Sequence, residues 1–173
     1  MDLHLIPGAA ASADEQQAID AVVIGTQAAE RHLLLPALHA AQACRGWITP
    51  GALNHICMRL SVPPAEAYGV ASFYAMFATT PRARRTVHVC DDIACRVKGA
   101  EALCRSLEAR FGPAGQDAAG TNGVATWVRS PCLGLCEQAP AALVQRAGDA
   151  RGDEAMARVS LDAVAAAVLT GES

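Results

Sequence analysis

Four of the seven cysteines in this sequence form two closely spaced pairs. Cys90 and Cys95 have four residues between them, and Cys132 and Cys136 have three. A cysteine thiolate is both a soft metal ligand and a nucleophile, so paired thiols are candidates for metal binding or redox chemistry. Four thiolates are the usual ligands of a 2Fe-2S cluster. These four cysteines are therefore the candidate ligands of such a cluster.

Other chemistries are compatible with parts of this pattern. Zinc sites commonly place roughly two to four residues between paired ligands, so a structural zinc site stays open. A thioredoxin-type redox site needs a CxxC motif, which neither pair has. A Rieske centre needs two histidine ligands, and no histidine lies near Cys132 or Cys136. Free cysteines also fill apolar cores, although loops that contain Gly and Pro are not core positions.

Both pairs follow segments that we expect to be strands of one sheet. Thr86–Val89 runs directly into Cys90, and Val124–Arg129 ends just before the loop of Cys132. Two strands that end at one edge of a sheet bring their following loops together. The other expected elements are a helix over Gly99–Phe111, strands over Ala141–Gln145 and near Ala155–Arg158, and a helix over Leu161–Leu169. This order predicts an α/β domain with one small sheet and two helices.

Helical periodicity dominates the chain before Pro81, where it changes to the two-residue period of strands. The expected helices cover Asp14–Arg31, Leu33–Cys44, Pro50–Leu60 and Ala65–Phe77. Residues 1–13 are small and unpatterned, and we expect them to form a loosely ordered N-terminal segment. The sequence therefore predicts a helical N-terminal domain over residues 14–80 and an α/β domain over residues 81–173.

The composition indicates a folded globular chain and argues against several classes of function. Apolar residues make up 52% of the chain, charged residues make up 18%, and the formal net charge is −3. No basic run is longer than Arg84–Arg85, so we expect no nucleic-acid binding. No stretch approaches the roughly 20 apolar residues that span a bilayer, so we expect no direct membrane insertion. The acidic start of the chain and the odd number of cysteines favour a cytoplasmic protein.

Four segments of the sequence resemble one known family. Two lie in the helical region: LLPALHAAQACRGWI, which ends at Ile48, and YGVASFYAMF, which ends at Phe77. The other two contain the cysteine pairs: VCDDIACRVKGAEAL, which begins at Val89, and SPCLGLCEQAPAALV, which begins at Ser130. Together they are similar to the thioredoxin-like 2Fe-2S ferredoxin subunit of NADH-oxidising complexes, the E subunit of bacterial respiratory complex I. Relatives of that subunit serve NAD-reducing hydrogenases and NAD-dependent formate dehydrogenases.

This resemblance implies a fold, a cofactor and partners. It implies a helical N-terminal region followed by a thioredoxin-like domain, with one 2Fe-2S cluster on Cys90, Cys95, Cys132 and Cys136. It also implies a non-catalytic redox subunit beside a partner that binds FMN and NADH, with a further iron-sulfur subunit in the complex. NAD and flavin are expected on that partner because no GxGxxG or GxxxxGK(S/T) motif opens a helix here. A free-standing ferredoxin and a zinc-stabilised interaction module remain alternatives.

Two carboxylates stand inside the first cysteine loop, where many relatives carry neutral residues. Reduction adds negative charge to a cluster, so Asp91 and Asp92 should lower its midpoint potential. Arg96 and Lys98 follow the loop and should offset part of that effect.

The other three cysteines stand inside predicted helices, without a partner at metal-ligand spacing. Small buried hydrophobic residues are the commonest role of such cysteines. We therefore expect no ligand role for Cys44, Cys57 or Cys104.

Overall fold

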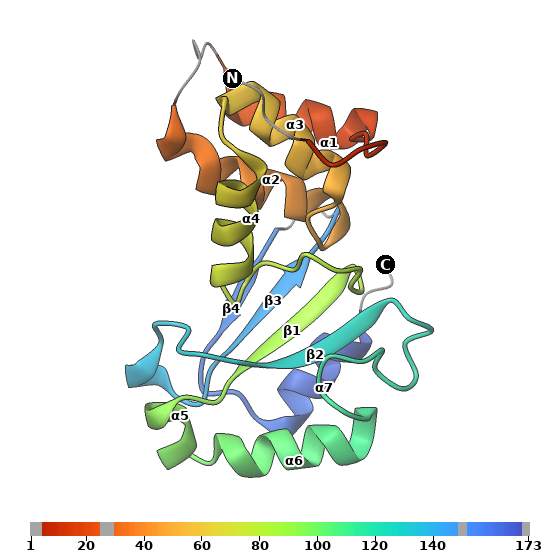
Figure 1. Cartoon of the computed structure of the whole chain (residues 1–173). Helices are drawn as coiled ribbons and strands as arrows, with labels where there is room; N and C mark the ends of the chain where they lie inside the picture. Colours follow the sequence, from red (N-terminus) through yellow and green to blue (C-terminus); the bar gives the residue numbers. More distant parts are fainter. Residues whose placement is uncertain (1–4, 25–29, 149–151, 171–173) are drawn as a thin grey trace. The chain divides into compact units, whose positions relative to one another are not determined.

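The protein is described by a computed structural model over residues 5–24, 30–148 and 152–170. It divides into two compact units, Met1–Pro81 and Arg82–Ser173 (Figure 1). Within the described residues the first unit is helical and the second contains the strands. The predicted α/β class, with helices preceding the sheet, is confirmed. None of the helices in these ranges is long and apolar enough to cross a bilayer.

Two of the helices in the first unit begin at side-chain caps. Ser12 and Glu15 form a capping box, in which the Glu15 carboxylate accepts the Ser12 backbone N–H at 2.8 Å. Thr49 caps the third helix, and Pro50 occupies its first turn. The helices are α1 (Ala13–Val22), α2 (Leu34–Arg45), α3 (Pro50–Leu60) and α4 (Pro64–Phe73), with a 3-10 turn η1 (Arg31–Leu33) before α2.

Two predicted helix ends are wrong. The first helix ends at Val22 instead of Arg31, and residues 25–29 of that prediction lie outside the described residues. The β-branched residues at the end of α1 are followed by a glycine, and both features weaken a helix. The fourth helix, α4, ends at Phe73 instead of Phe77 because Tyr74 adopts an extended backbone. This change of direction buries Phe77, which packs edge-on against the His39 ring at a centroid distance of 4.7 Å.

In its described part, residues 5–12, the segment before α1 is not the loose segment that its composition predicted, and residues 1–4 of that prediction lie outside the described residues. The Asn54 side chain on α3 accepts the Ile6 backbone N–H at 2.9 Å and donates to the carbonyls of Ile6 and Ala9. A Cβ atom at Gly51 would overlap the backbone of Ala10, so the segment lies directly on α3. Residues 5–12 are therefore held by a buried amide that is distant in the sequence.

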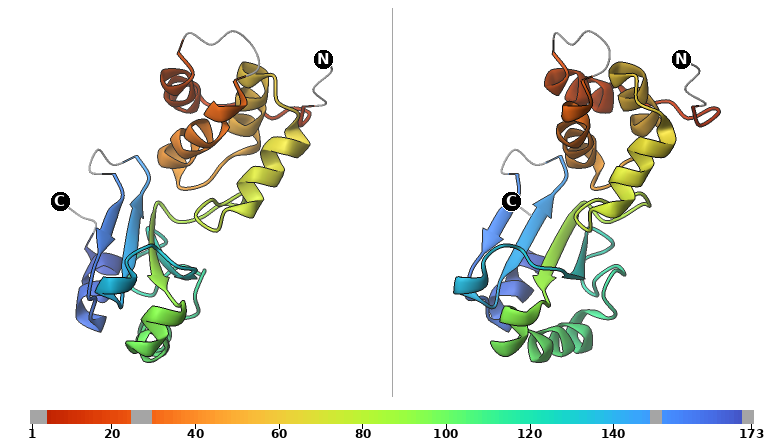
Figure 2. Two further views of the ribbon diagram at one scale, coloured as in Figure 1. Left: turned by 90° about the vertical axis from the view of Figure 1, so that its left-hand side faces the viewer. Right: turned by 60° about the vertical axis from the view of Figure 1, so that its left-hand side comes forward.

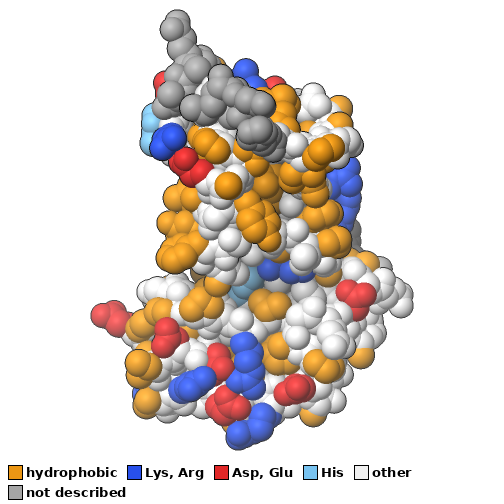
Figure 3. Space-filling view, viewed as in Figure 1, with side chains coloured by type: hydrophobic (Ala, Val, Ile, Leu, Met, Phe, Trp, Pro, Cys, Tyr) orange, Lys and Arg blue, Asp and Glu red, His pale blue; other side chains and the backbone are white. Residues whose placement is uncertain are grey.

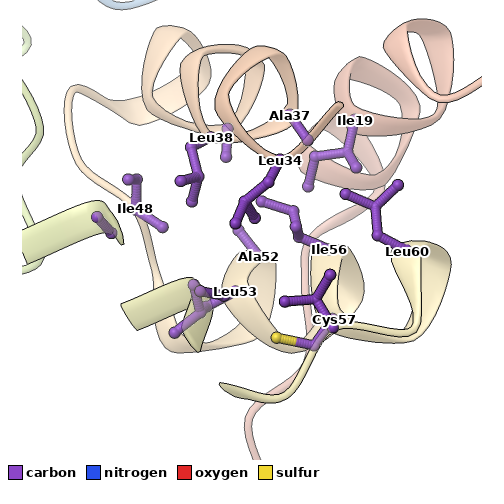
Figure 4. Close-up of a cluster of buried hydrophobic side chains, with 14 of the residues drawn as sticks. Ile19, Leu34, Ala37, Leu38, Ile48, Ala52, Leu53, Ile56, Cys57 and Leu60 are labelled. Atoms are coloured by element: carbon purple, nitrogen blue, oxygen red, sulfur yellow. The ribbon is translucent and has the colours of Figure 1, made fainter. Parts of the chain in front are cut away.

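The core of the first unit lies between α1, α2 and α3. Figure 4 shows Ile19, Leu38, Ile56 and Leu60 pointing into this space. All four side chains are fully buried, and the small residues between them let the helices approach closely. Their spacing on each helix gives the amphipathic pattern from which the helices were predicted.

One carboxylate is buried at the edge of this core. Glu15 accepts hydrogen bonds from the Thr49 hydroxyl at 2.8 Å and the Ser12 hydroxyl at 2.9 Å, and the Arg45 guanidinium lies at 3.5 Å. Burial by itself raises the pKa of Glu15, but the hydrogen bonds from Ser12 and Thr49 and the charge of Arg45 outweigh it and lower the pKa. The ionised carboxylate thus joins the starts of α1 and α3 to the end of α2.

The second unit is built on a four-stranded sheet with the order β2-β1-β3-β4. β1 pairs with β2 in parallel, whereas the β1–β3 and β3–β4 pairs are antiparallel. The parallel pair requires a crossover, which α6 supplies. The strands are β1 (Arg85–Cys90), β2 (Ala125–Ser130), β3 (Ala142–Arg146) and β4 (Glu154–Met156), and the long helices are α6 (Ala100–Phe111) and α7 (Leu161–Leu169).

Helices α6 and α7 cover one face of this sheet (Figures 1 and 2). Trp127 of β2 is fully buried there, and its indole N–H donates to the Gly112 carbonyl at 3.0 Å. His88 of β1 points to the opposite face, where its ring lies 2.8 Å from the Gln145 amide oxygen. Burial, and then the charge of Arg82, lower the pKa of His88 to about 4, so this imidazole is neutral at physiological pH.

The first prediction concerns the buried carboxylate. We expect Glu15→Gln to lower the free energy of unfolding by about 2 kcal/mol at pH 7, because hydrogen bonds to a charged group are lost. The folded-state pKa is lowered, so the stabilisation is present above the unfolded-state pKa of about 4.3 and is lost as pH falls through the lower folded-state value. Denaturant unfolding followed by circular dichroism at several pH values measures the difference.

Glu108→Gln, at an exposed position of α6, is the control for this experiment. It removes the same charge without removing a buried hydrogen-bond network. A difference between wild type and Glu15→Gln that stays constant from pH 7 to pH 3 would contradict the assigned role of the carboxylate.

Candidate metal centre

The two cysteine loops leave the same edge of the sheet. β1 and β2 are parallel, and Cys90 at the end of β1 lies opposite Ser130 at the end of β2. The chain then forms a short helix α5 (Ile93–Val97) after β1 and a 3-10 turn η2 (Cys136–Gln138) after β2. Helix α5 and turn η2 lie beside each other at one end of the sheet (Figure 1). Parallel pairing thus brings together two segments that are about forty residues apart.

The four paired cysteines line one cavity of about 310 Å³. Cys90 and Cys95 are 3% and 2% exposed, whereas Cys132 and Cys136 are exposed. The Sγ atoms of Cys132 and Cys136 are 3.3 Å apart. The rest of the wall is formed by Asp92, Ile93, Ala94, Leu135 and Ala141. The cavity is therefore an apolar hollow with one buried pair of thiols and one exposed pair.

Backbone hydrogen bonds and burial hold the inner pair of thiols. The Cys90 N–H donates to the Ala141 carbonyl at 3.0 Å, which extends the β1–β3 pairing into the loop. Burial, followed by a hydrogen bond with Cys90, raises the pKa of Cys95 to about 11. Neighbouring sulfur favours the neutral thiol, so binding a cation in this cavity must release protons.

Cys136 of the exposed pair is also affected by a neighbouring sulfur. The hydrogen bond with Cys132 is the main cause that raises the pKa of Cys136. The Gly134 backbone N–H donates to the Cys132 sulfur at 3.4 Å. The turn over Cys132–Cys136 therefore directs both thiols and one backbone donor to the same side.

The helix α5 inside the first loop was not predicted from the sequence. It is only five residues long, too short for a detectable hydrophobic period. Its signal was the N-cap residue: one oxygen of Asp92 accepts the Ile93 N–H at 2.7 Å. The other oxygen accepts the Cys132 N–H at 3.2 Å, so Asp92 contacts both cysteine loops.

The sequence matches the thioredoxin-like [2Fe-2S] ferredoxin family over residues 19–165. The chain belongs to this family. The resemblance drawn from its four segments is confirmed, and a 2Fe-2S cluster is the cofactor of the family.

The relatives of this ferredoxin are subunits of NADH-quinone oxidoreductases. It is 34% identical to the E subunit from Mycobacterium tuberculosis over 122 residues, which cover 70% of this chain and 48% of the relative. It is 33% identical to the E subunit from Pseudomonas aeruginosa over 120 residues, which cover 69% of this chain and 70% of the relative. It is 30% identical to subunit 2 from Thermus thermophilus over 142 residues, which cover 82% of this chain and 76% of the relative. The chain thus spans about half the length of its mycobacterial relatives.

A solved structure shares the fold. A chain of an NAD+-reducing [NiFe]-hydrogenase in the H2-reduced state superposes with a TM-score of 0.60 at 34% sequence identity. The match covers 79% of this chain and 21% of the hydrogenase chain. The thioredoxin-like fold predicted from the resemblance is therefore confirmed.

The three other cysteines of the ferredoxin are not among the residues that line the cavity. Cys57 is in the core of the first unit, and Cys104 is in the core between the sheet and its helices. Burial raises the pKa of each of these two thiols to about 11. Cys44 is partly buried on α2, where its thiol lies 3.8 Å from the Asp14 carbonyl.

Asp91 is an ion-pair residue, which sequence reasoning did not foresee. Its carboxylate lies 2.7 Å from Arg129 of β2 and 3.1 Å from Arg96 of α5. The hydrogen bond from Arg96 is the main cause that lowers the pKa of Asp91. Arg129 also contacts Glu101 of α6 at 2.8 Å. Figure 3 shows charged side chains of both signs side by side over α5 and α6.

The second prediction tests this network. Arg129→Gln removes the cation between Asp91 and Glu101, and we expect the free energy of unfolding to fall by about 1 kcal/mol at low salt. The loss should shrink in high salt because these charges are partly exposed. Urea unfolding at two ionic strengths measures both effects.

Arg105→Gln is the matched control for the ion-pair network. Arg105 lies 3.7 Å from the same Glu101 carboxylate but is 67% exposed and does not reach the cysteine loop. If both arginine variants lost the same stability, the link from Arg129 to the loop would not contribute.

Proposed function

We propose that this ferredoxin holds one 2Fe-2S cluster on Cys90, Cys95, Cys132 and Cys136 and carries electrons within an NADH-linked oxidoreductase complex. The observation that carries the proposal is the convergence of two cysteine loops on one apolar cavity at the edge of the sheet. The family match supports the cofactor. The domain over residues 81–173 would supply all four ligands, and the helical domain over residues 14–80 none.

The pairing of the thiols favours a cluster over a single zinc ion. A structural zinc ion needs four ligands arranged tetrahedrally around one point. Here the four thiols form one buried pair, Cys90 and Cys95, and one exposed pair, Cys132 and Cys136. A 2Fe-2S cluster has two irons, each held by two protein ligands, so two pairs along one cavity suit it better.

The protein supplies surroundings and access for this cluster. When bound, the cluster takes up and releases one electron at a time. Cys90 and Cys95 are buried at one side of the cavity, and most of the remaining wall is apolar. Cys132 and Cys136 are exposed, so a redox partner would approach from their side.

The NADH-binding and flavin-binding roles belong to a partner in this proposal. The sequence contains no glycine-rich motif for a dinucleotide or a triphosphate. Its relatives are named as subunits of NADH-quinone oxidoreductases, and the hydrogenase that shares its fold reduces NAD+. We therefore propose a partner subunit that binds FMN and NADH, and a further iron-sulfur subunit beyond it.

We also propose a cytoplasmic location for this subunit. All seven cysteines are free. The thiol pool of the cytosol keeps cysteines reduced, and reduced cysteines are what an iron-sulfur cluster requires.

The third prediction identifies the ligands. The anaerobically purified chain should contain about two iron and two sulfide ions, and Cys90→Ser, Cys95→Ser, Cys132→Ser and Cys136→Ser should each disrupt the cluster. Iron and sulfide analysis, visible absorption and electron paramagnetic resonance of the reduced protein measure this. Stoichiometric zinc without sulfide would support the zinc-stabilised module instead.

The other three cysteines provide the control variants for this ligand test. Cys57→Ala and Cys104→Ala suit buried apolar sites, and Cys44→Ser suits a partly buried one. All three should leave the cluster spectrum unchanged. Loss of the cluster in any of them, with the fold intact, would reassign a ligand.

The fourth prediction concerns the partner. Affinity purification of the tagged chain from its native host should recover a larger subunit that contains flavin, and the isolated chain should not oxidise NADH. Flavin fluorescence and an NADH–ferricyanide assay measure the two outcomes. A chain that carries a cluster but recovers no flavoprotein would favour the free-standing ferredoxin.

A further inference from the structure

Among the described residues, Asp92 is the one carboxylate in the wall of the cysteine cavity. We propose that Asp92 is a positioning residue: it holds the second cysteine loop against the first by accepting the Cys132 backbone N–H. The effect on a bound cluster rests on the proposed function. The link between the loops does not, because it is formed by residues of this chain alone.

The geometry assigns a separate task to each carboxylate oxygen. Oδ1 accepts the Ile93 N–H at 2.7 Å and caps α5, while Oδ2 accepts the Cys132 N–H at 3.2 Å. Asp92 and Cys132 are 40 residues apart. One short side chain therefore fixes the start of α5 and the start of the second cysteine turn at the same time.

The direction of the Cys132 N–H matters for a cluster in this cavity. Hydrogen bonds to the sulfur atoms of an iron-sulfur centre, and charges beside it, are among the factors that set its reduction potential. In this turn the Gly134 N–H donates to the Cys132 sulfur, whereas the Cys132 N–H donates to Asp92. Asp92 thus occupies one donor and adds a negative charge, and both effects disfavour the added electron.

Asp91 differs from Asp92 although the two are adjacent. Asp91 is paired with Arg96 and Arg129, so its charge is compensated. Asp92 has no ion pair within the described ranges, and its contacts there are with backbone N–H groups. The expectation that both carboxylates lower the potential is therefore refined, since Asp92 carries the larger share.

Asp92→Asn is the informative substitution because it keeps the side-chain shape. Its oxygen still caps α5. Its amide group cannot accept the Cys132 N–H, and the charge is removed. Glu137→Gln is the matched control, because Glu137 is an exposed carboxylate next to Cys136 that lies outside the cavity wall. Asp92→Ser, which also caps a helix without a second acceptor, provides an independent variant should Asp92→Asn fail to fold.

The experiment has one measurement without a cluster and two with it. In the apo chain, hydrogen–deuterium exchange at the Cys132 amide, resolved by NMR, should be several-fold faster in Asp92→Asn than in wild type. In the reconstituted protein, Asp92→Asn should raise the midpoint potential in a redox titration followed by electron paramagnetic resonance. The Asp92→Asn variant should lose its cluster to an iron chelator about tenfold faster than the wild type does. Glu137→Gln should shift each quantity less.

The outcomes separate this inference from the proposed function. A wild-type chain that takes up no 2Fe-2S cluster would overturn the proposed function, while the amide exchange would still test the link between the loops. Unchanged Cys132 exchange in Asp92→Asn and Asp92→Ser would overturn the link. A midpoint potential that rises no more in these variants than in Glu137→Gln would overturn the role of Asp92 in the potential.

Discussion

The parallel pairing of β1 and β2 is the constraint on which the metal centre depends. Parallel strands end at the same edge of a sheet, so Cys90 and the loop after Ser130 leave the sheet side by side. A crossover of this length requires a helix, and α6 provides both the connection and part of the core. If the two strands were antiparallel, the cysteine loops would lie at opposite ends of the sheet.

Charged side chains then secure the two loops at this edge. Asp91 joins the first loop to β2 through Arg129, and Asp92 joins it to the second loop through the Cys132 N–H. Adjacent residues in a turn point in different directions, so two identical carboxylates have different partners. One of them becomes part of an ion-pair network, and the other lies in the cavity wall without a cation beside it among the described residues.

The helical unit uses a buried carboxylate for a comparable purpose. Glu15 receives hydrogen bonds from Ser12 and Thr49 and lies beside Arg45, so one charge connects three helices. A buried charge is stable only when its hydrogen-bonding capacity is satisfied, and here the caps of two helices satisfy it. Asn54 similarly fixes the segment that precedes α1.

The sequence alone determined the features that depend on residue type and short spacing. The cysteine pairs, the strands before them and the helices that Thr49 and Ser160 cap could all be read locally, because a cap acts within three residues of itself. The tertiary structure decided which distant groups meet. Arg129 reaches Asp91 across 38 residues, and Cys132 reaches Asp92 across 40. No local pattern marks such contacts, because they exist only after β1 and β2 have paired.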